Sequence, residues 1–97
     1  MGSFGNKAVI TEELSSTSVS GYLYIVCKTP SNNGANAIVY VGNVYGVWTQ
    51  VKQTNLYPPN QVMWLYCGYV TDISEVAVTA YNQYSGYLSE ILVDDHM

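Results

Sequence analysis

The sequence predicts an all-β fold, a small antiparallel β-sandwich of about seven strands with an immunoglobulin-like or jelly-roll-like topology. Three observations indicate this: residues prone to β-structure dominate, they occur in short runs, and clusters of Gly, Pro and Asn separate the runs regularly. Val, Ile, Thr and Tyr lose side-chain freedom in a helix, so no segment favours one. The 97 residues suit one domain, and we expect a single sandwich over 1–97 with flexible ends at 1–6 and 94–97.

The expected strands lie, in chain order, at residues 7–14, 19–28, 37–44, 47–53, 62–70, 75–82 and 87–93. The segment "TPSNNGAN" at 29–36 contains residues that tolerate turn dihedral angles. "NVYG" at 43–46 predicts a tight hairpin in which Gly46 takes a positive φ. The two prolines of "YPPN" at 57–60 cannot continue a ladder, so we expect the chain to cross between sheets there. "NQYSG" at 82–86 joins the last two strands.

Alternation within the strands separates a core face from a solvent face. The predicted core consists of Leu23, Ile25, Cys27, Val47, Val51, Leu65, Cys67, Val76 and Val78. In the 62–70 strand the same alternation places Tyr69 on the core side and Val70 on the outer side. The predicted outer residues include an unusual number of aromatic ones: Tyr22, Tyr24, Trp48, Trp64, Tyr66 and Tyr81.

Charge is scarce, at 10 % of the residues against about 25 % in ordinary soluble domains. The net charge is −4, and the only cationic side chains besides His96 are Lys7, Lys28 and Lys52. Nucleic acid binding needs clustered cations to neutralise phosphates, so we expect no nucleic acid partner. The longest apolar run, "YLYIVC" at 22–27, is of strand length, and we expect no membrane insertion. No secretory signal is visible, while the composition favours an extracellular, cell-surface or virion setting.

The sequence lacks a recognisable pair of nucleophile and general base, so we expect neither an enzymatic activity nor a cofactor. Its single histidine, His96, is the penultimate residue, where chains commonly fray. No Ser or Cys has an ordered base beside it in this pattern. The one metal hypothesis is calcium held by acids gathered at one end of the sandwich, with solvated acids as the simpler interpretation. Its ligands would be Asp72, Glu75, Asp94 and Asp95.

The two cysteines, Cys27 and Cys67, both fall on the predicted core face of central strands. An inter-sheet disulfide is geometrically reasonable for this placement. Two buried thiols acting as small apolar side chains fit the pattern equally well. The sequence leaves both alternatives open.

The outward aromatic residues predict a contact surface, because exposed Tyr and Trp in charge-poor surroundings are typical of interfaces. The candidate binding residues are Tyr22, Tyr24, Trp48, Gln50, Asn55, Tyr57, Trp64 and Tyr66. We expect a non-catalytic, self-associating structural or adhesive subunit whose partner is itself or another protein. The segment "AIVYVGNV" at 37–44 also lacks a guarding lysine, which suggests an edge open to strand addition. The alternative is a lectin-like domain that stacks glycans on the aromatic rings and bonds their hydroxyls with Gln and Asn.

Overall fold

The computed structural model describes residues 2–5, 9–29, 35–56, 61–80 and 86–94. These residues form eight strands: β1 Gly2–Phe4, β2 Ile10–Glu13, β3 Val19–Lys28, β4 Ala35–Gly42, β5 Trp48–Leu56, β6 Val62–Ile73, β7 Glu75–Thr79 and β8 Gly86–Asp94. Within the described ranges no helix has the length and hydropathy needed to span a bilayer. The predicted all-β class is confirmed. Tyr57, Tyr81, Asp95 and His96 lie outside the described residues.

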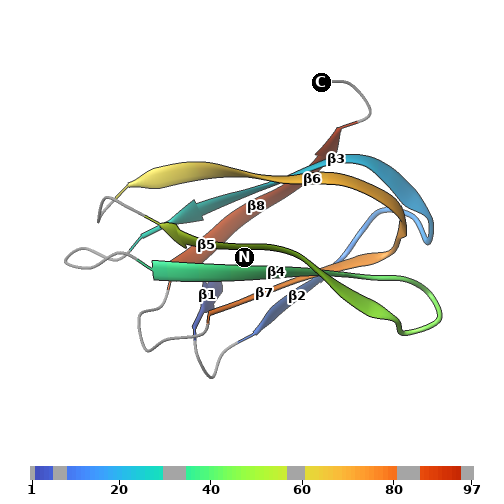
Figure 1. The fold of residues 1–97 in the computed structure, drawn as a ribbon, viewed down its shortest axis with the longest axis horizontal. Coiled ribbons are helices and arrows are strands. Elements are labelled where there is room, and N and C mark those ends of the chain that lie inside the picture. Colours follow the sequence, from blue (N-terminus) through green and yellow to red (C-terminus); the bar gives the residue numbers. More distant parts are fainter. Residues whose placement is uncertain (1, 6–8, 30–34, 57–60, 81–85, 95–97) are drawn as a thin grey trace.

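Two four-stranded antiparallel sheets pack against each other (Figure 1). The first sheet has the order β1-β8-β3-β6, and the second sheet has the order β2-β7-β4-β5. Strand pairs are therefore nested, with β4 on β5, β3 on β6, β2 on β7 and β1 on β8. This is a long hairpin rolled into two layers, the jelly-roll arrangement of a β-sandwich. The chain changes sheets between β5 and β6, as the two prolines in that segment predicted.

The core lies between the inner faces of the two sheets. Leu23 and Ile25 of β3 and Val76 and Val78 of β7 are fully buried, as the alternation predicted. Cys27 and Cys67 are buried in the same cluster, with Leu65 and Val51 packed against it half-buried. Burial of each large aliphatic side chain contributes about 1.5–3 kcal/mol, so these positions hold the two layers together.

The N-terminal segment is part of this core rather than a free end. Gly2–Phe4 pair with β8, and the Phe4 side chain is fully buried. The carbonyl of Gly5 accepts hydrogen bonds from the Thr79 hydroxyl and the Ala80 amide. Residues 2–4 thus form a strand within the segment 1–6 that the sequence analysis expected to be a flexible end. A three-residue strand with one aromatic residue is too short to show periodicity.

Two β-bulges interrupt the alternation of inward-facing and outward-facing side chains along β6. Tyr22 pairs with Tyr69 but Tyr24 pairs with Tyr66, so β6 has one extra residue at this point, where Gly68 has a φ of 92°. A bulge reverses the faces of the residues beyond it. Val70 is consequently buried, and Tyr69 is 59 % exposed on the outer face. The prediction that Tyr69 points into the core is wrong for this reason.

A second correction concerns the hairpin between β4 and β5. The turn at 43–46 forms as predicted, with the Gly46 amide bonded to the Asn43 carbonyl and Gly46 at a φ of 77°. Val47, predicted as core, instead belongs to this turn. Its amide donates to the Asn43 side-chain oxygen, and its side chain is 56 % exposed.

All four sheet edges carry features that discourage strand addition. The edge strands β1 and β2 are only three and four residues long. In β5 a register shift at Val51 places Lys52 opposite the fully buried Val39, hence on the inner face. In β6 a further bulge at Asp72, with φ 54°, follows the one at Gly68. Short, bulged edges and inward lysines block edge-to-edge pairing.

The 37–44 segment is mostly β4, a central strand, so the expectation that it is an open edge is wrong.

Candidate binding surfaces

The outer face of the first sheet, here called the aromatic face, has four rows of side chains across β8, β3 and β6. The register gives these rows as Tyr87–Lys28–Val62, Glu90–Val26–Trp64, Leu92–Tyr24–Tyr66 and Asp94–Tyr22–Tyr69. Trp64 is 63 % exposed, and Tyr66, Tyr69 and Tyr87 are also exposed. Val26 is nevertheless buried, because the neighbouring side chains cover it. Four of the predicted binding residues lie together here: Tyr22, Tyr24, Trp64 and Tyr66.

Four tyrosines of β3 and β6 form one packed cluster on this face. The ring centroids of Tyr22 and Tyr69 are 5.1 Å apart in an edge-to-face arrangement. Those of Tyr24 and Tyr66 are 5.2 Å apart and tilted, and those of Tyr22 and Tyr66 are 6.5 Å apart. Such pairs contribute about 0.5–1.5 kcal/mol each beyond burial, so the rings stabilise one another and hold a fixed surface.

Charge on the aromatic face is confined to its ends and one flank. Lys28 lies in the first row and Asp94 in the last, six strand residues apart along β3, or about 20 Å. Glu90 lies on the flank, in β8. The β3 and β6 positions of the two central rows therefore present an apolar and aromatic strip between a cationic end and an anionic end, with Glu90 of β8 beside it.

The other candidate binding residues that the structure describes lie on the opposite side of the molecule, in the second sheet. Trp48, Gln50 and Asn55 belong to the outer face of the second sheet, here called the polar face. Gln53 shares this face, and the Gln50 amide nitrogen lies 3.4 Å from the Gln53 side-chain oxygen. The single surface predicted from sequence is thus two surfaces of different chemistry, because β3 and β6 belong to one sheet and β5 to the other.

Sequence reasoning missed three contributors to the aromatic face. Tyr87 and Leu92 of β8 are exposed there, and Tyr69 reaches it through the Gly68 bulge. Alternation with the buried Leu88 could have identified Tyr87. Nothing in the local pattern indicates which strands lie beside β3, so the strip could not be assembled in advance.

The two cysteines are free thiols in adjacent strands of the same sheet, so the inter-sheet disulfide is not formed. Cys27 is registered with Met63, four residues from Cys67, which separates the two by about 13 Å along the strands. A disulfide needs α-carbons within about 7 Å. Burial raises the pKa of Cys67 to about 12, although the Lys52 ammonium acts to lower it, and burial raises that of Cys27 to about 11. Both thiols act as apolar core side chains.

The acids of the calcium hypothesis do not assemble in the part of the chain that the structure describes, where no group of three or more His, Cys, Asp or Glu side chains could hold a metal ion. Asp72 accepts a 2.7 Å hydrogen bond from the Ser18 hydroxyl, and its amide donates to Ser20. Glu75 is paired with Gly42 on the polar face, and Asp94 with Tyr22 on the aromatic face. Glu75 and Asp94 therefore belong to opposite outer faces of the sandwich, which does not favour a shared calcium site.

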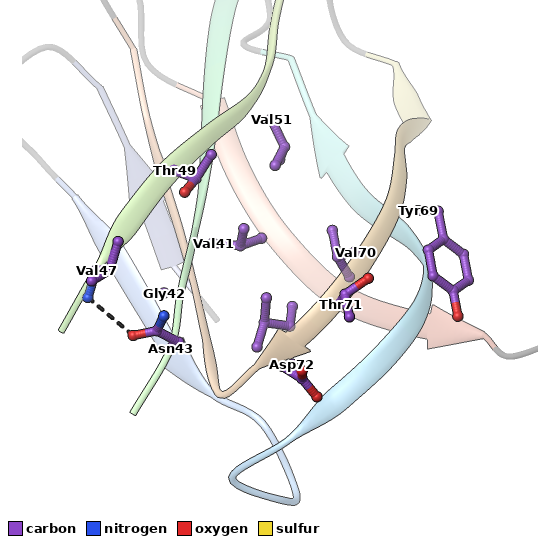
Figure 2. A pocket seen from close by; sticks show the side chains of 11 residues that line it. Val41, Gly42, Asn43, Val47, Thr49, Val51, Tyr69, Val70, Thr71 and Asp72 are labelled. Carbon is purple, nitrogen blue, oxygen red and sulfur yellow. Dashed lines mark hydrogen bonds between the residues drawn. The ribbon is translucent and has the colours of Figure 1, made fainter. Parts of the chain in front are cut away.

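A cleft of about 290 Å³ opens between β5 and β6, where the two sheets separate (Figure 2). Its walls are mainly aliphatic, including Val41, Val51 and Val70, and Thr49 contributes a hydroxyl. The Tyr69 ring points away from it, and Asn43 is bonded to the Val47 amide at its rim. The cleft is a gap over the core with no catalytic grouping among its lining residues.

Comparisons with protein-family models, with curated proteins and with solved structures found no match to this chain. The functional assignment therefore depends on the chemistry of the two outer faces.

Proposed function

We propose that this chain is a non-catalytic, self-associating subunit whose contact surface is the aromatic face. One observation carries the proposal: six aromatic side chains from three adjacent strands lie on the same outer face, and four of their rings form a packed cluster. They are Tyr22, Tyr24, Trp64, Tyr66, Tyr69 and Tyr87. Contiguous apolar surface of this kind is rare on monomers, and Tyr and Trp lead the side chains enriched at interfaces.

The distribution of charge favours a second copy of the chain as the partner. A two-fold axis lying in the contact plane and perpendicular to the strands brings the first row of one copy onto the last row of the other. Lys28 then faces the Tyr22–Asp94 row of its partner at both ends of the interface. The same operation places Trp64 on the partner's Tyr66, and Glu90 on the partner's Leu92 at the β8 flank. The part of the face formed by β3 and β6 is self-complementary, as a two-fold contact requires.

The dimensions of the face suit a reversible dimer. The four rows of the face extend about 27 Å along β3, and three strands span about 14 Å, which gives roughly 380 Å² in projection on each copy. Specific interfaces bury about 1,200–2,000 Å² of accessible surface in total, so this contact falls below the standard size, in the range of weak and transient contacts. We therefore expect association that depends on protein concentration. The guarded sheet edges favour this face-to-face mode over strand addition.

Sedimentation velocity over a range of protein concentrations tests the proposal. The expected result is a monomer–dimer equilibrium that the double variant Trp64→Ser, Tyr66→Ser shifts to monomer. The matched control is Tyr45→Ser. It removes the most exposed aromatic side chain among the described residues, which is 87 % exposed in the β4–β5 turn and lies outside the aromatic face. A chain that stays monomeric at high concentration, or one whose association is equally sensitive to Tyr45→Ser, would contradict the assignment.

A further inference from the structure

The polar face carries an aromatic platform of unusual geometry. A β-carbon built at Gly42 would lie 3.0 Å from each of Cδ2, Cε2 and Cε3 of Trp48. Equal approach to three atoms of one ring means that the indole lies flat on the Gly42 backbone, since an edge contact would bring one atom closer. Trp48 is still 44 % exposed, so the opposite side of the ring faces solvent.

Amide side chains continue from this platform along β5. Gln50, Gln53 and Asn55 follow Trp48 on the same face, at successive positions about 7 Å apart. On the neighbouring β4 they are flanked by Tyr40, Ile38 and Asn36, and the Asn36 side-chain amide donates to the Asn55 side-chain oxygen. Each amide group offers both donors and acceptors, which lets it bond to a hydroxyl in either direction.

The charge of this face restricts the ligand. Lys52, the cation of β5, is turned to the inner face by the bulge at Val51. Among the described residues of the polar face, the groups that carry a charge at neutral pH are the carboxylates Glu13 and Glu75, in the row that contains Gly42 and Trp48. An anionic ligand would meet repulsion there without a compensating cation. A neutral polyhydroxylated ligand meets rings and amides that match it.

We propose that the polar face binds a neutral saccharide, with the C–H face of a pyranose ring stacked on Trp48 and its hydroxyls bonded to Gln50 and Gln53. The flat, supported indole provides the stacking surface, and the amides along β5 provide the hydrogen bonds. This site is separate from the aromatic face, so its occupation does not depend on self-association. A site this open and shallow predicts millimolar affinity for a single saccharide chain.

The two tryptophans allow a direct test, because the chain contains no others. In the variant Trp64→Phe, Trp48 is the only indole, and its fluorescence reports on the polar face. The probes are cellotetraose, maltotetraose and N-acetylchitotetraose, with sialyllactose as the anionic comparison. We expect saturable change with at least one neutral probe, and binding of the sialylated probe about tenfold weaker or worse. No response to any neutral probe at roughly 10 mM, above the expected dissociation constant, overturns the proposal.

Substitutions on the two faces test where the saccharide binds, and a replacement variant is available if one of them does not fold. Gln50→Ala should reduce affinity, and Ser3→Ala, an exposed position of β1 in the other sheet, should leave it unchanged. Trp48→Ala should abolish retention on a column bearing the saccharide that responded. If that variant fails to fold, Gly42→Ala serves in its place, because it displaces the ring without removing it. Retention that survives in the folded Trp48→Ala protein, or that is lost in Ser3→Ala instead, places the saccharide elsewhere and refutes the assignment.

Discussion

The indole of Trp48 lies against the α-carbon of Gly42, too close for any larger residue there to fit without movement of the ring. Gly42→Ala should therefore destabilise the fold by about 1 kcal/mol through overpacking. In a Trp48→Ala background the same change should be neutral or stabilising, since the new methyl group has space and alanine restricts the unfolded chain. Urea denaturation of the four proteins measures this coupling. Additive effects would show that the two residues do not interact as described.

Charge reversal tests the orientation of the proposed dimer. Lys28→Glu should weaken dimerisation several-fold, because it places a carboxylate beside the partner's Asp94 at both ends of the contact. Adding Asp94→Lys should restore much of the loss, since the reversed pair attracts again. The measurement is the dimer dissociation constant at low and moderate salt. Equal loss in the single and double variants would exclude the two-fold arrangement, though not the aromatic contact itself.

The bulge at Gly68 supplies a stability prediction. A residue with a β-carbon is strained at a φ of 92°, even though the space around Gly68 is open. Gly68→Ala should lower the free energy of unfolding by about 1–2 kcal/mol. Thermal and urea unfolding measure the loss, and an unchanged stability would contradict the assigned bulge. Self-association should weaken too if the register of Tyr69 shifts.

The buried thiols predict an alkaline loss of stability. In the unfolded chain a thiol ionises near pH 8.5, whereas in the folded protein the pKa of Cys67 is about 12. Between these values the unfolded state releases the proton and the folded state retains it, so stability falls as the pH rises. Cys67→Ala should flatten the decline between about pH 9 and 11, and part of the decline should remain because Cys27, with a pKa of about 11, is present in both proteins. Identical profiles would mean that Cys67 is not protonated and buried as described.

Much of the fold could be predicted because its strands are regular. In β3 every residue from Tyr22 to Cys27 lies on the face that alternation assigned to it. The turn before Val47 was also predictable, because Asn43 and Gly46 favour it. These features depend only on neighbours in sequence.

The errors arose where a single extra residue changes the register. The bulge at Gly68 places Tyr69 on the outer face, against the prediction, and the bulge at Val51 places Lys52 on the inner face, where strict alternation from Trp48 would put it outside. Bulges depend on the partner strand as much as on local sequence. Sheet membership was also beyond local reasoning. Trp48 and Trp64 looked equivalent in sequence, yet pairing between distant strands places them on opposite sides of the molecule.

The two outer faces point in opposite directions across the thickness of the sandwich. In the proposed dimer, two copies contact each other through their aromatic faces, and the two proposed saccharide sites would point away from each other. Such a dimer would be bivalent, and it would link two separate surfaces instead of binding one saccharide chain twice. Its avidity then depends on how densely sugars are displayed, and weak individual sites suffice for firm cross-linking.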